Sequence, residues 1–398
     1  MAEDQPRSPL RADTRLVQVG RAAPRAHGFV NPALVRGSTV LHPSCADRAA
    51  AGGHRFEQAL VYGLLGTPTH FALEDAIAEI EGGTRCQIVS SGLAACTLPL
   101  MAYLKSGDHC LMPDSVYGPT RHFCDTVLSG LRITTTYYPP TIDPAALGLM
   151  CRPTTRVLFL ESPGSHSFEM QDVPALAEAA HARGIKVLMD NTWGIHFFQP
   201  FAHGVDVALQ ALTKYVGGHS DLLLGAITTR ADEDWERVRG TALAFGQYAS
   251  PDDCWLALRG VRTLSVRLYH QMESGIRVAR WFSERPEVRS VLHPALPGAP
   301  GHAIWQRDYT GACSLFGVVF QPDISAESMI AMIDALALFG IGASWGGYES
   351  LALPTTGTIR RTNSPPLAGP AARFHIGLED PADLIADLTQ AFTRLRRA

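Results

Sequence analysis

The sequence predicts an α/β fold with a mostly parallel central sheet and a smaller α+β domain at its C-terminal end. Two observations support this prediction. Apolar strands alternate with a helical segment between residues 155 and 229, and the pattern changes near residue 250, where longer helices begin. A strand, a crossover helix and a second strand normally form a parallel unit. We expect an arm over residues 1–60 that contacts a neighbouring subunit, a large domain over 61–250 and a C-terminal domain over 251–398.

The central sheet is predicted from short apolar runs that end in polar residues. A helix between the first two runs has Asp172 placed to cap its start and Gly184 to end it. The predicted strands cover residues 155–161, 185–190, 205–209 and 222–229, and the helix covers 174–183.

The C-terminal domain is predicted to begin with a helix at Ser250 and Pro251, a hydroxyl cap followed by proline in the first turn. Apolar residues then recur at helical spacing from Leu258 to Ile276. A strand over 313–320 and helices over 325–339 and 382–395 complete the domain. The long loop over 354–370 is the least compact segment, and loops of this length often serve a site.

Composition excludes several classes of protein. The formal net charge of -4 provides no basic surface for nucleic acid or anionic lipid, and no apolar run approaches the ~20 residues of a membrane span. Glu3 and Asp4 interrupt the N-terminal segment, so we expect no secretory signal. The eight cysteines contain no C-x-x-C pair, which favours reduced thiols in the cytoplasm over disulfides or a metal site.

Only three of the 34 lysine and arginine residues are lysines: Lys105, Lys186 and Lys214. Arginine cannot lose its proton or form an imine, so a lysine is informative wherever the chemistry needs an amine. Lys105 and Lys186 have the surroundings of surface cations. Lys214 directly follows an apolar strand, among small and hydroxyl residues, where a Schiff-base lysine is expected.

Other polar groups are predicted to lie near Lys214, because ligands bind at the carboxyl ends of parallel strands. Asp190 ends one strand, and the turn from Ser90 to Ala95 offers free N–H groups at a helix start. A lysine, a carboxylate and an anion cradle are the groups that pyridoxal phosphate requires. Tyr117 is placed to stack on its ring. Each feature has an ordinary structural explanation alone, as a cap, a turn residue or a solvated side chain, and only their combination indicates the cofactor.

At these residues the chain resembles the Cys/Met-metabolism family of fold-type I pyridoxal-phosphate enzymes. The similarity runs from about residue 62 to 387, and two stretches, 160–165 and 344–350, favour its cystathionine β-lyase branch over its γ-enzymes. The markers are Tyr62-Gly63, Gly66-Thr67-Pro68-Thr69, Glu79-Ile80-Glu81-Gly82-Gly83, Asp190-Asn191-Thr192-Trp193, Thr213-Lys214-Tyr215, Gly218-His219-Ser220-Asp221 and His375-Ile376-Gly377-Leu378-Glu379-Asp380.

The resemblance implies roles for the cofactor site. Lys214 would bind the cofactor and move the substrate α-proton, Asp190 would pair with the pyridinium nitrogen, and Tyr117 would stack. Thr213 and the turn formed by Ser91, Gly92 and Leu93 would hold the phosphate.

The resemblance also implies a substrate and an assembly. Arg373 would clamp the substrate carboxylate with Ser344 and Trp345 beside it, and Tyr62 would enter the neighbouring subunit's site, giving active dimers within a tetramer. The implied activity is carbon–sulfur β-elimination on L-cystathionine or related cysteine S-conjugates, which releases a thiol (homocysteine), pyruvate and ammonia.

The chain departs from the family pattern at Leu64, where an arginine to the neighbouring cofactor phosphate is usual. Such a charged hydrogen bond is worth ~1.5–3 kcal/mol. His54, Arg55 or His70 could replace it, or the turn alone could suffice. Leu64 and Leu65 also suggest that the site accepts apolar thioether substituents.

Three other functions stay open at this stage. The first is γ-elimination or γ-replacement within the same family. The second is a regulator that binds pyridoxal phosphate with vestigial activity. The third, a nucleotide-binding α/β protein, is disfavoured because the turn at residues 90–95 lacks a glycine-rich dinucleotide motif.

Overall fold

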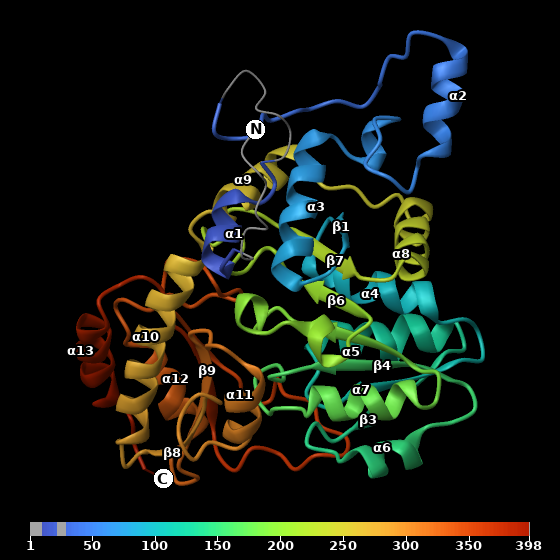
Figure 1. Ribbon diagram of the computed structural model, residues 1–398. Coiled ribbons are helices and arrows are strands. Elements are labelled where there is room, and N and C mark those ends of the chain that lie inside the picture. The colour runs from blue at the N-terminus through green and yellow to red at the C-terminus, as the bar shows by residue number, and fades with distance from the viewer. Residues whose placement is uncertain (1–9, 22–28, 398) are drawn as a thin grey trace.

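The computed structural model describes residues 10–21 and 29–397, which form two β-sheets flanked by helices (Figure 1). Glu3 and Asp4, on which the expected absence of a secretory signal depends, lie outside this part. The larger sheet has seven strands in the order β1-β7-β6-β5-β4-β2-β3. These strands are Arg85–Val89 (β1), His109–Pro113 (β2), Thr134–Tyr138 (β3), Thr155–Glu161 (β4), Lys186–Asp190 (β5), Val207–Gln210 (β6) and Gly225–Thr229 (β7).

The large sheet is mostly parallel, as predicted. Strands β3, β2, β4, β5 and β6 run in one direction, and β7 is antiparallel to both of its neighbours, β6 and β1. The register pairs Glu161, the last residue of β4, with Asp190, the last residue of β5. Two carboxylates therefore lie side by side where the parallel strands end.

Helices cover both faces of this sheet because its strands are apolar on both sides. Leu158 and Leu160 of β4 belong to one core, whereas Val157 and Phe159 belong to the other. The first core contains residues of α3 (Pro68–Glu81), α6 (Pro144–Met150) and α7 (Val173–His181). The second contains residues of α4 (Gly92–Tyr103) and α8 (Asp232–Ala244), with Phe123 of α5 (Gly118–Phe123) packed against it. One π-helical turn (Cys124–Leu128) extends α5, and 3-10 turns cover Ile195–Phe197 and Pro200–His203.

The helical run predicted after Ser250 is two helices rather than one. Ser250 caps α9 (Pro251–Val261) by accepting a hydrogen bond from the N–H of Asp252, as predicted. The chain then turns at Arg262 and Thr263 before α10 (Leu264–Ser283) begins. Gly260 lies so close to the 214–217 loop that a Cβ there would be 2.1 Å from the carbonyl oxygen of Val216. The turn thus brings α9 against the backbone that carries Lys214.

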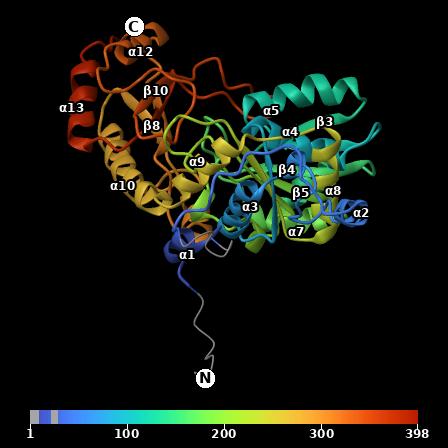
Figure 2. The ribbon, with the colours of Figure 1, turned by 90° about the horizontal axis from the view of Figure 1, so that it is seen from above.

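The smaller sheet belongs to a C-terminal lobe beside the large sheet (Figures 1 and 2). Its four strands are antiparallel in the order β10-β11-β9-β8. They are Val288–Leu292 (β8), Leu315–Phe320 (β9), Leu351–Pro354 (β10) and Ala371–His375 (β11). The lobe also contains α10, α11 (His302–Asp308), α12 (Ala326–Asp334) and α13 (Pro381–Phe392). The α+β character of this region agrees with the prediction, and the domain boundaries near residues 60 and 250 stay predictions.

The N-terminal region contains little that is buried. It includes α1 (Ala12–Gln18), α2 (Cys45–Gly53) and a 3-10 turn (Gly63–Leu65). No residue of α2 is buried, and Figure 1 shows this helix standing off the large sheet. Within the described residues, no helix combines the length and apolar character needed to cross a membrane. All eight cysteines lie in the described part, and each is a free thiol.

A buried acid joins α3 to the middle of the large sheet. Glu81 is fully buried and accepts hydrogen bonds from Asn191 Nδ2 at 3.1 Å and from Gln210 Nε2 at 2.6 Å. Burial raises the pKa of Glu81 to about 8, against which the two amide hydrogen bonds act only partly. In the described part of the chain, Asn191 Oδ1 and Gln210 Oε1 have no hydrogen-bond partner. If either side-chain amide rotated, its oxygen could accept a hydrogen bond from the protonated carboxyl of Glu81.

We expect the Glu81→Gln variant to change how stability depends on pH. Because the folded-state pKa of Glu81 exceeds its ordinary value of 4.5, the wild type loses stability as the pH rises from about 4.5 towards about 8. The variant cannot ionise, so between pH 6 and 8 its free energy of unfolding should fall by about 2 kcal/mol less than that of the wild type. Urea unfolding at fixed cofactor concentration measures this difference.

The matched control for this experiment is Glu178→Gln, the same change at an exposed position of α7. It should leave the pH dependence of stability as in the wild type. Parallel pH profiles for wild type and Glu81→Gln would contradict the explanation.

Candidate active site

A cavity of about 380 Å³ lies where the large sheet meets the C-terminal lobe. Its wall includes loops that follow β1, β2, β4, β5 and β6, together with residues near β10 and β11 of the small sheet. Ten of the predicted site residues line it: Ser91, Gly92, Leu93, Tyr117, Asp190, Thr213, Lys214, Ser344, Trp345 and Arg373.

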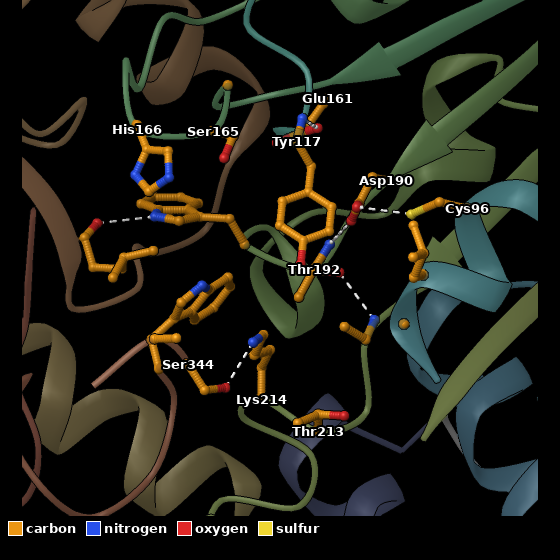
Figure 3. Close-up of a pocket in the computed structure, with 18 of the residues that line it drawn as sticks. Cys96, Tyr117, Glu161, Ser165, His166, Asp190, Thr192, Thr213, Lys214 and Ser344 are labelled. Atoms are coloured by element: carbon orange, nitrogen blue, oxygen red, sulfur yellow. Dashed lines mark hydrogen bonds between the residues drawn. The ribbon is translucent and has the colours of Figure 1, made fainter. Parts of the chain in front are cut away.

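Lys214 follows β6 and projects into this cavity (Figure 3). Its Nζ donates a hydrogen bond to Ser344 Oγ at 2.7 Å and lies 5.3 Å from the centre of the Trp345 ring. Burial, the largest cause, and the nearby Arg373 guanidinium together lower the pKa of Lys214 to about 8, against the opposing effect of Asp190. Roughly a tenth of the amine is therefore unprotonated at pH 7, far more than in a lysine of ordinary pKa.

Asp190 ends β5 on the side of the cavity away from Ser344 (Figure 3). Its Oδ1 accepts the N–H of Thr192 at 2.9 Å, and its Oδ2 accepts the thiol of Cys96 at 3.4 Å. Burial raises the pKa of this carboxyl, since desolvation disfavours the charged form. A cationic group in the cavity would stabilise the carboxylate.

The turn before α4 offers backbone N–H groups at a positive helix end. Ser91 caps the helix by accepting the N–H of Ala94 at 3.1 Å. Gly92 must lack a side chain, because a Cβ there would lie 2.6 Å from the Cβ of Ala211. The glycine thus lets this turn pack against Ala211, and the backbone N–H groups at the helix start, which line the cavity at Gly92 and Leu93, can bind an anion. The hydroxyl of Thr213 donates to Leu224 O and accepts from Leu224 N, at 3.2 and 3.1 Å, which fixes the loop before Lys214.

Tyr117 is held by a carboxylate that the sequence did not single out. The backbone N–H of Tyr117 donates to Glu161 Oε2 at 2.7 Å. Burial, with a further contribution from nearby Asp190, raises the pKa of Glu161 well above its ordinary value. Figure 3 shows Tyr117 and Lys214 pointing towards each other across the cavity. A planar ring placed between them would contact the tyrosine.

Arg373 lies on β11 with its side chain buried. Its Nη2 donates to the carbonyl oxygens of Ala343 and Ser344 at 3.3 and 3.0 Å, which leaves its other nitrogens available. Burial lowers the pKa of Arg373 to about 10, so it stays a cation at neutral pH. The arrangement suits a carboxylate ligand.

The loop that carries Ser344 and Trp345 is held in place by His375 and by the close packing of Gly346 against Lys214. The N–H of Gly346 donates to Nε2 of the fully buried His375 at 3.1 Å, and burial lowers the pKa of His375 to about 3. Gly346 has a φ of 89°, and a Cβ there would lie 2.8 Å from the carbonyl carbon of Lys214. A neutral histidine and a glycine thus hold Ser344 close to Lys214.

Tyr62 is the one predicted site residue that does not line the cavity of its own subunit. It is 49% exposed and immediately precedes the 3-10 turn that contains Leu64 and Leu65. Its predicted entry into a neighbouring site stays a prediction. His70 is already used within its own subunit, because its ring contacts the N–H of Thr67 and the carbonyl of Ala249.

The sequence did not single out several residues of the wall. Cys96 and His166 carry no motif, whereas Glu161, Thr192 and Trp193 belong to marker stretches without assigned roles. For Glu161, His166, Thr192 and Trp193 the available signal was their position at or shortly after the ends of β4 and β5, because strand ends of a parallel sheet meet at one edge. Cys96 lies within α4, where no such signal exists.

The cavity fits pyridoxal phosphate in the chemistry of its groups. A lysine with a lowered pKa, a buried carboxylate with a weak thiol partner on one oxygen, and the N-terminal start of helix α4 surround one space. They match the needs of the aldehyde, the ring nitrogen and the phosphate. Fold and site together define a pyridoxal-phosphate-dependent enzyme.

Comparisons with known proteins agree. Residues 13–393 match the model of the Cys/Met metabolism PLP-dependent enzyme family. A putative cystathionine beta-lyase of Rhizobium johnstonii is 44% identical, over 96% of this chain and 95% of that protein. The cystathionine beta-lyase of Escherichia coli is 40% identical, over 96% and 98%. The crystal structure of cystathionine gamma synthase from Xanthomonas oryzae pv. oryzae has a TM-score of 0.89 at 28% identity, over 97% and 99%.

The chain belongs to the Cys/Met metabolism family of pyridoxal-phosphate-dependent enzymes. The predicted family, fold class and cofactor are confirmed. Within the family it is a carbon–sulfur lyase, as the sequence predicts.

We expect borohydride reduction of the yellow holoenzyme to fix the cofactor on the peptide that contains Lys214. The Lys214→Ala variant should give no labelled peptide, and its turnover should fall by about 10²–10⁴-fold or more because it loses both the anchor and the proton-transferring amine. Peptide mass spectrometry and a thiol-release assay measure the two effects.

The control is Lys105→Ala, which removes an exposed amine outside the cavity. Its labelling and turnover should match those of the wild type. Cofactor recovered on a peptide with Lys105 or Lys186 would contradict the assignment.

Proposed function

We propose that this enzyme catalyses β-elimination on L-cystathionine and related cysteine S-conjugates, releasing homocysteine or another thiol, pyruvate and ammonia. The observation that supports this most is the position of Lys214 Nζ, between Ser344 and Trp345 and in the same cavity as Asp190 and Arg373. The relatives at 44% and 40% identity bear the name cystathionine beta-lyase.

Substrate binding begins with its α-carboxylate. Arg373 would hold this group by paired N–H···O bonds, because its Nη2 is already oriented by the carbonyls of the 342–344 segment. Pyridoxal phosphate, when bound, supplies an aldehyde for covalent attachment and a protonated ring that withdraws electrons from the substrate α-carbon. Asp190 would keep the ring nitrogen protonated, since within residues 10–21 and 29–397 its Oδ2 has only the Cys96 thiol as partner.

Lys214 would then take the proton from the substrate α-carbon. Its lowered pKa places the amine in the range where a general base is effective at neutral pH. Ser344 Oγ, 2.7 Å from Nζ, orients the amine. The thiolate leaves from the β-carbon, and the remaining three-carbon product hydrolyses to pyruvate and ammonia.

We also propose a homo-oligomer, with active dimers in a tetramer, and a cytoplasmic location. The exposed Tyr62 and the absence of buried residues in α2 support the first, since both surfaces suit a neighbouring subunit. Eight free thiols support the second.

The competing reaction is γ-elimination or γ-replacement, which the similarity to a cystathionine gamma synthase structure favours. Keto-acid analysis of cystathionine turnover separates the reactions. We expect pyruvate and homocysteine, because β-elimination breaks the bond between sulfur and the three-carbon half.

The outcomes of that assay are distinct. Formation of 2-oxobutyrate and cysteine would show γ-elimination and contradict the proposal. Cofactor binding without any keto acid would favour the vestigial regulator.

We expect Arg373→Lys to raise the KM for cystathionine by about tenfold or more, with a smaller change in kcat. Lysine keeps the charge but loses the paired donors, and a charged hydrogen bond is worth ~1.5–3 kcal/mol. Steady-state pyruvate formation measures both constants. Arg289→Lys, the same change at an exposed position of β8, should leave them unaltered. An unchanged KM in Arg373→Lys would rule out the carboxylate role.

A further inference from the structure

A second cavity, of about 450 Å³, adjoins the first. Tyr117, Ser165 and His166 line both cavities and form the partition between them. The far wall is formed by the start of α5 and by the loop that joins β10 to β11, which contributes Arg360. A substituent extending past Tyr117, away from Lys214, would enter this space.

Asp114 is the one acid among the residues that line the second cavity, and its carboxylate is already bound by other groups of the protein. Asp114 forms an ion pair with Arg121 at 3.0 Å, with the two side chains 0% and 8% exposed. Its carboxylate also accepts the backbone N–H groups of Thr362 and Asn363, at 2.8 and 2.9 Å. These contacts hold the pKa of Asp114 below its ordinary value despite burial. Asp114 and Arg121 neutralise each other, so neither attracts a ligand strongly.

Arg360 supplies the cavity with positive charge that is not neutralised locally. It lines the wall and is exposed, and across residues 10–21 and 29–397 it forms no ion pair with a carboxylate. The imidazole of His122, on the last turn of α5, lines the same space and is also exposed. The excess charge is therefore cationic.

Two polar atoms in the wall lack partners. Ser115 is 2% exposed, and its Oγ forms no hydrogen bond within the described chain. His166 Nδ1 is also without a partner there. Leaving a buried polar group unpaired is unfavourable, so a ligand that offers oxygen atoms at this position would be favoured.

We propose that the second cavity binds a carboxylate at the far end of the substrate's S-substituent. The preferred substrates are then cysteine thioethers whose substituent carries a terminal carboxylate. Cystathionine belongs to this class, but its distal ammonium group has no free carboxylate in the wall to bind. This inference rests on the proposed β-lyase function and specifies the substrate class of the same site.

The inference differs from the preference for apolar substituents that Leu64 and Leu65 suggest. Those leucines lie outside both cavities of their own subunit. The second cavity is built from this chain's own α5 start and 354–370 loop, so its charge is the more direct indication.

Four substrates of equal chain length test the inference: L-cystathionine, S-(3-carboxypropyl)-L-cysteine, S-(3-aminopropyl)-L-cysteine and S-butyl-L-cysteine. We expect kcat/KM for the carboxypropyl compound to lie within about threefold of that for cystathionine, because only the unbound ammonium is missing. It should exceed kcat/KM for the butyl and aminopropyl compounds by about tenfold or more, the factor expected for one charged hydrogen bond.

The Arg360→Gln variant should lower the ratio of carboxypropyl to butyl turnover by about tenfold, and Arg360→Lys should restore most of it. Arg289→Gln, an exposed arginine of β8, should leave the ratio unchanged. Calorimetric binding to the Lys214→Ala protein gives a readout without turnover. There the carboxypropyl compound should bind about tenfold more tightly than the butyl compound, and adding Arg360→Gln should remove the difference.

The outcomes separate the two proposals. No pyruvate from any of the four compounds would contradict the β-lyase function. Pyruvate formed equally well or better from the butyl or aminopropyl compound would overturn the carboxylate cavity and leave the β-lyase function standing. An unchanged substrate ratio in Arg360→Gln would likewise overturn it.

Discussion

The burial of one amine among opposite charges governs this active site. Desolvation and the nearby Arg373 guanidinium both destabilise the protonated form of Lys214, whereas the nearby Asp190 carboxylate stabilises it. Its pKa of about 8 is the balance of these effects. Other parts of the structure hold the groups around Lys214 in place. His375 and Gly346 fix the loop that carries Ser344, and the register of β4 and β5 fixes the position of Asp190.

The register of β4 and β5 also places two carboxylates side by side at the edge of the sheet. Glu161 and Asp190 are adjacent in the sheet, and burial raises the pKa of both. Both line the cavity, and they differ in their partners: Glu161 accepts the backbone N–H of Tyr117, whereas Asp190 accepts that of Thr192 and, on its other oxygen, the weak thiol donor of Cys96. The sheet therefore orients the tyrosine with one acid and leaves the other for a cationic ligand.

Local patterns in the sequence predicted much of this structure. Strand β4 has the predicted bounds, and β5 and α7 lie within two residues of theirs, because apolar runs and caps are local signals. The direction of β7 depends on its neighbours in the sheet and carries no local signal. The break at Arg262 depends on how closely α9 approaches the Lys214 loop, and helical spacing continues across it.

The site was predicted to a similar extent and for a similar reason. Asp190 and Lys214 follow strands, so the edge of a parallel sheet brings them together. The contact between Cys96 and Asp190 joins residues 94 positions apart, and no sequence motif predicts it. The role of Tyr62 depends on a second chain, so it stays a prediction.

The hairpin connection between β10 and β11 reaches from the small sheet to the large one. Thr362 and Asn363 are anchored on Asp114, which follows β2, through an acid that is itself paired with buried Arg121. Separating the loop from Asp114 would leave the ion pair with Arg121 intact, because both residues follow β2, but it would remove two backbone N–H bonds to a charged carboxylate, each worth ~1.5–3 kcal/mol. These bonds tie the connection between β10 and β11 to the loop that follows β2, beside the second cavity, and so disfavour a separation of the two sheets at this point.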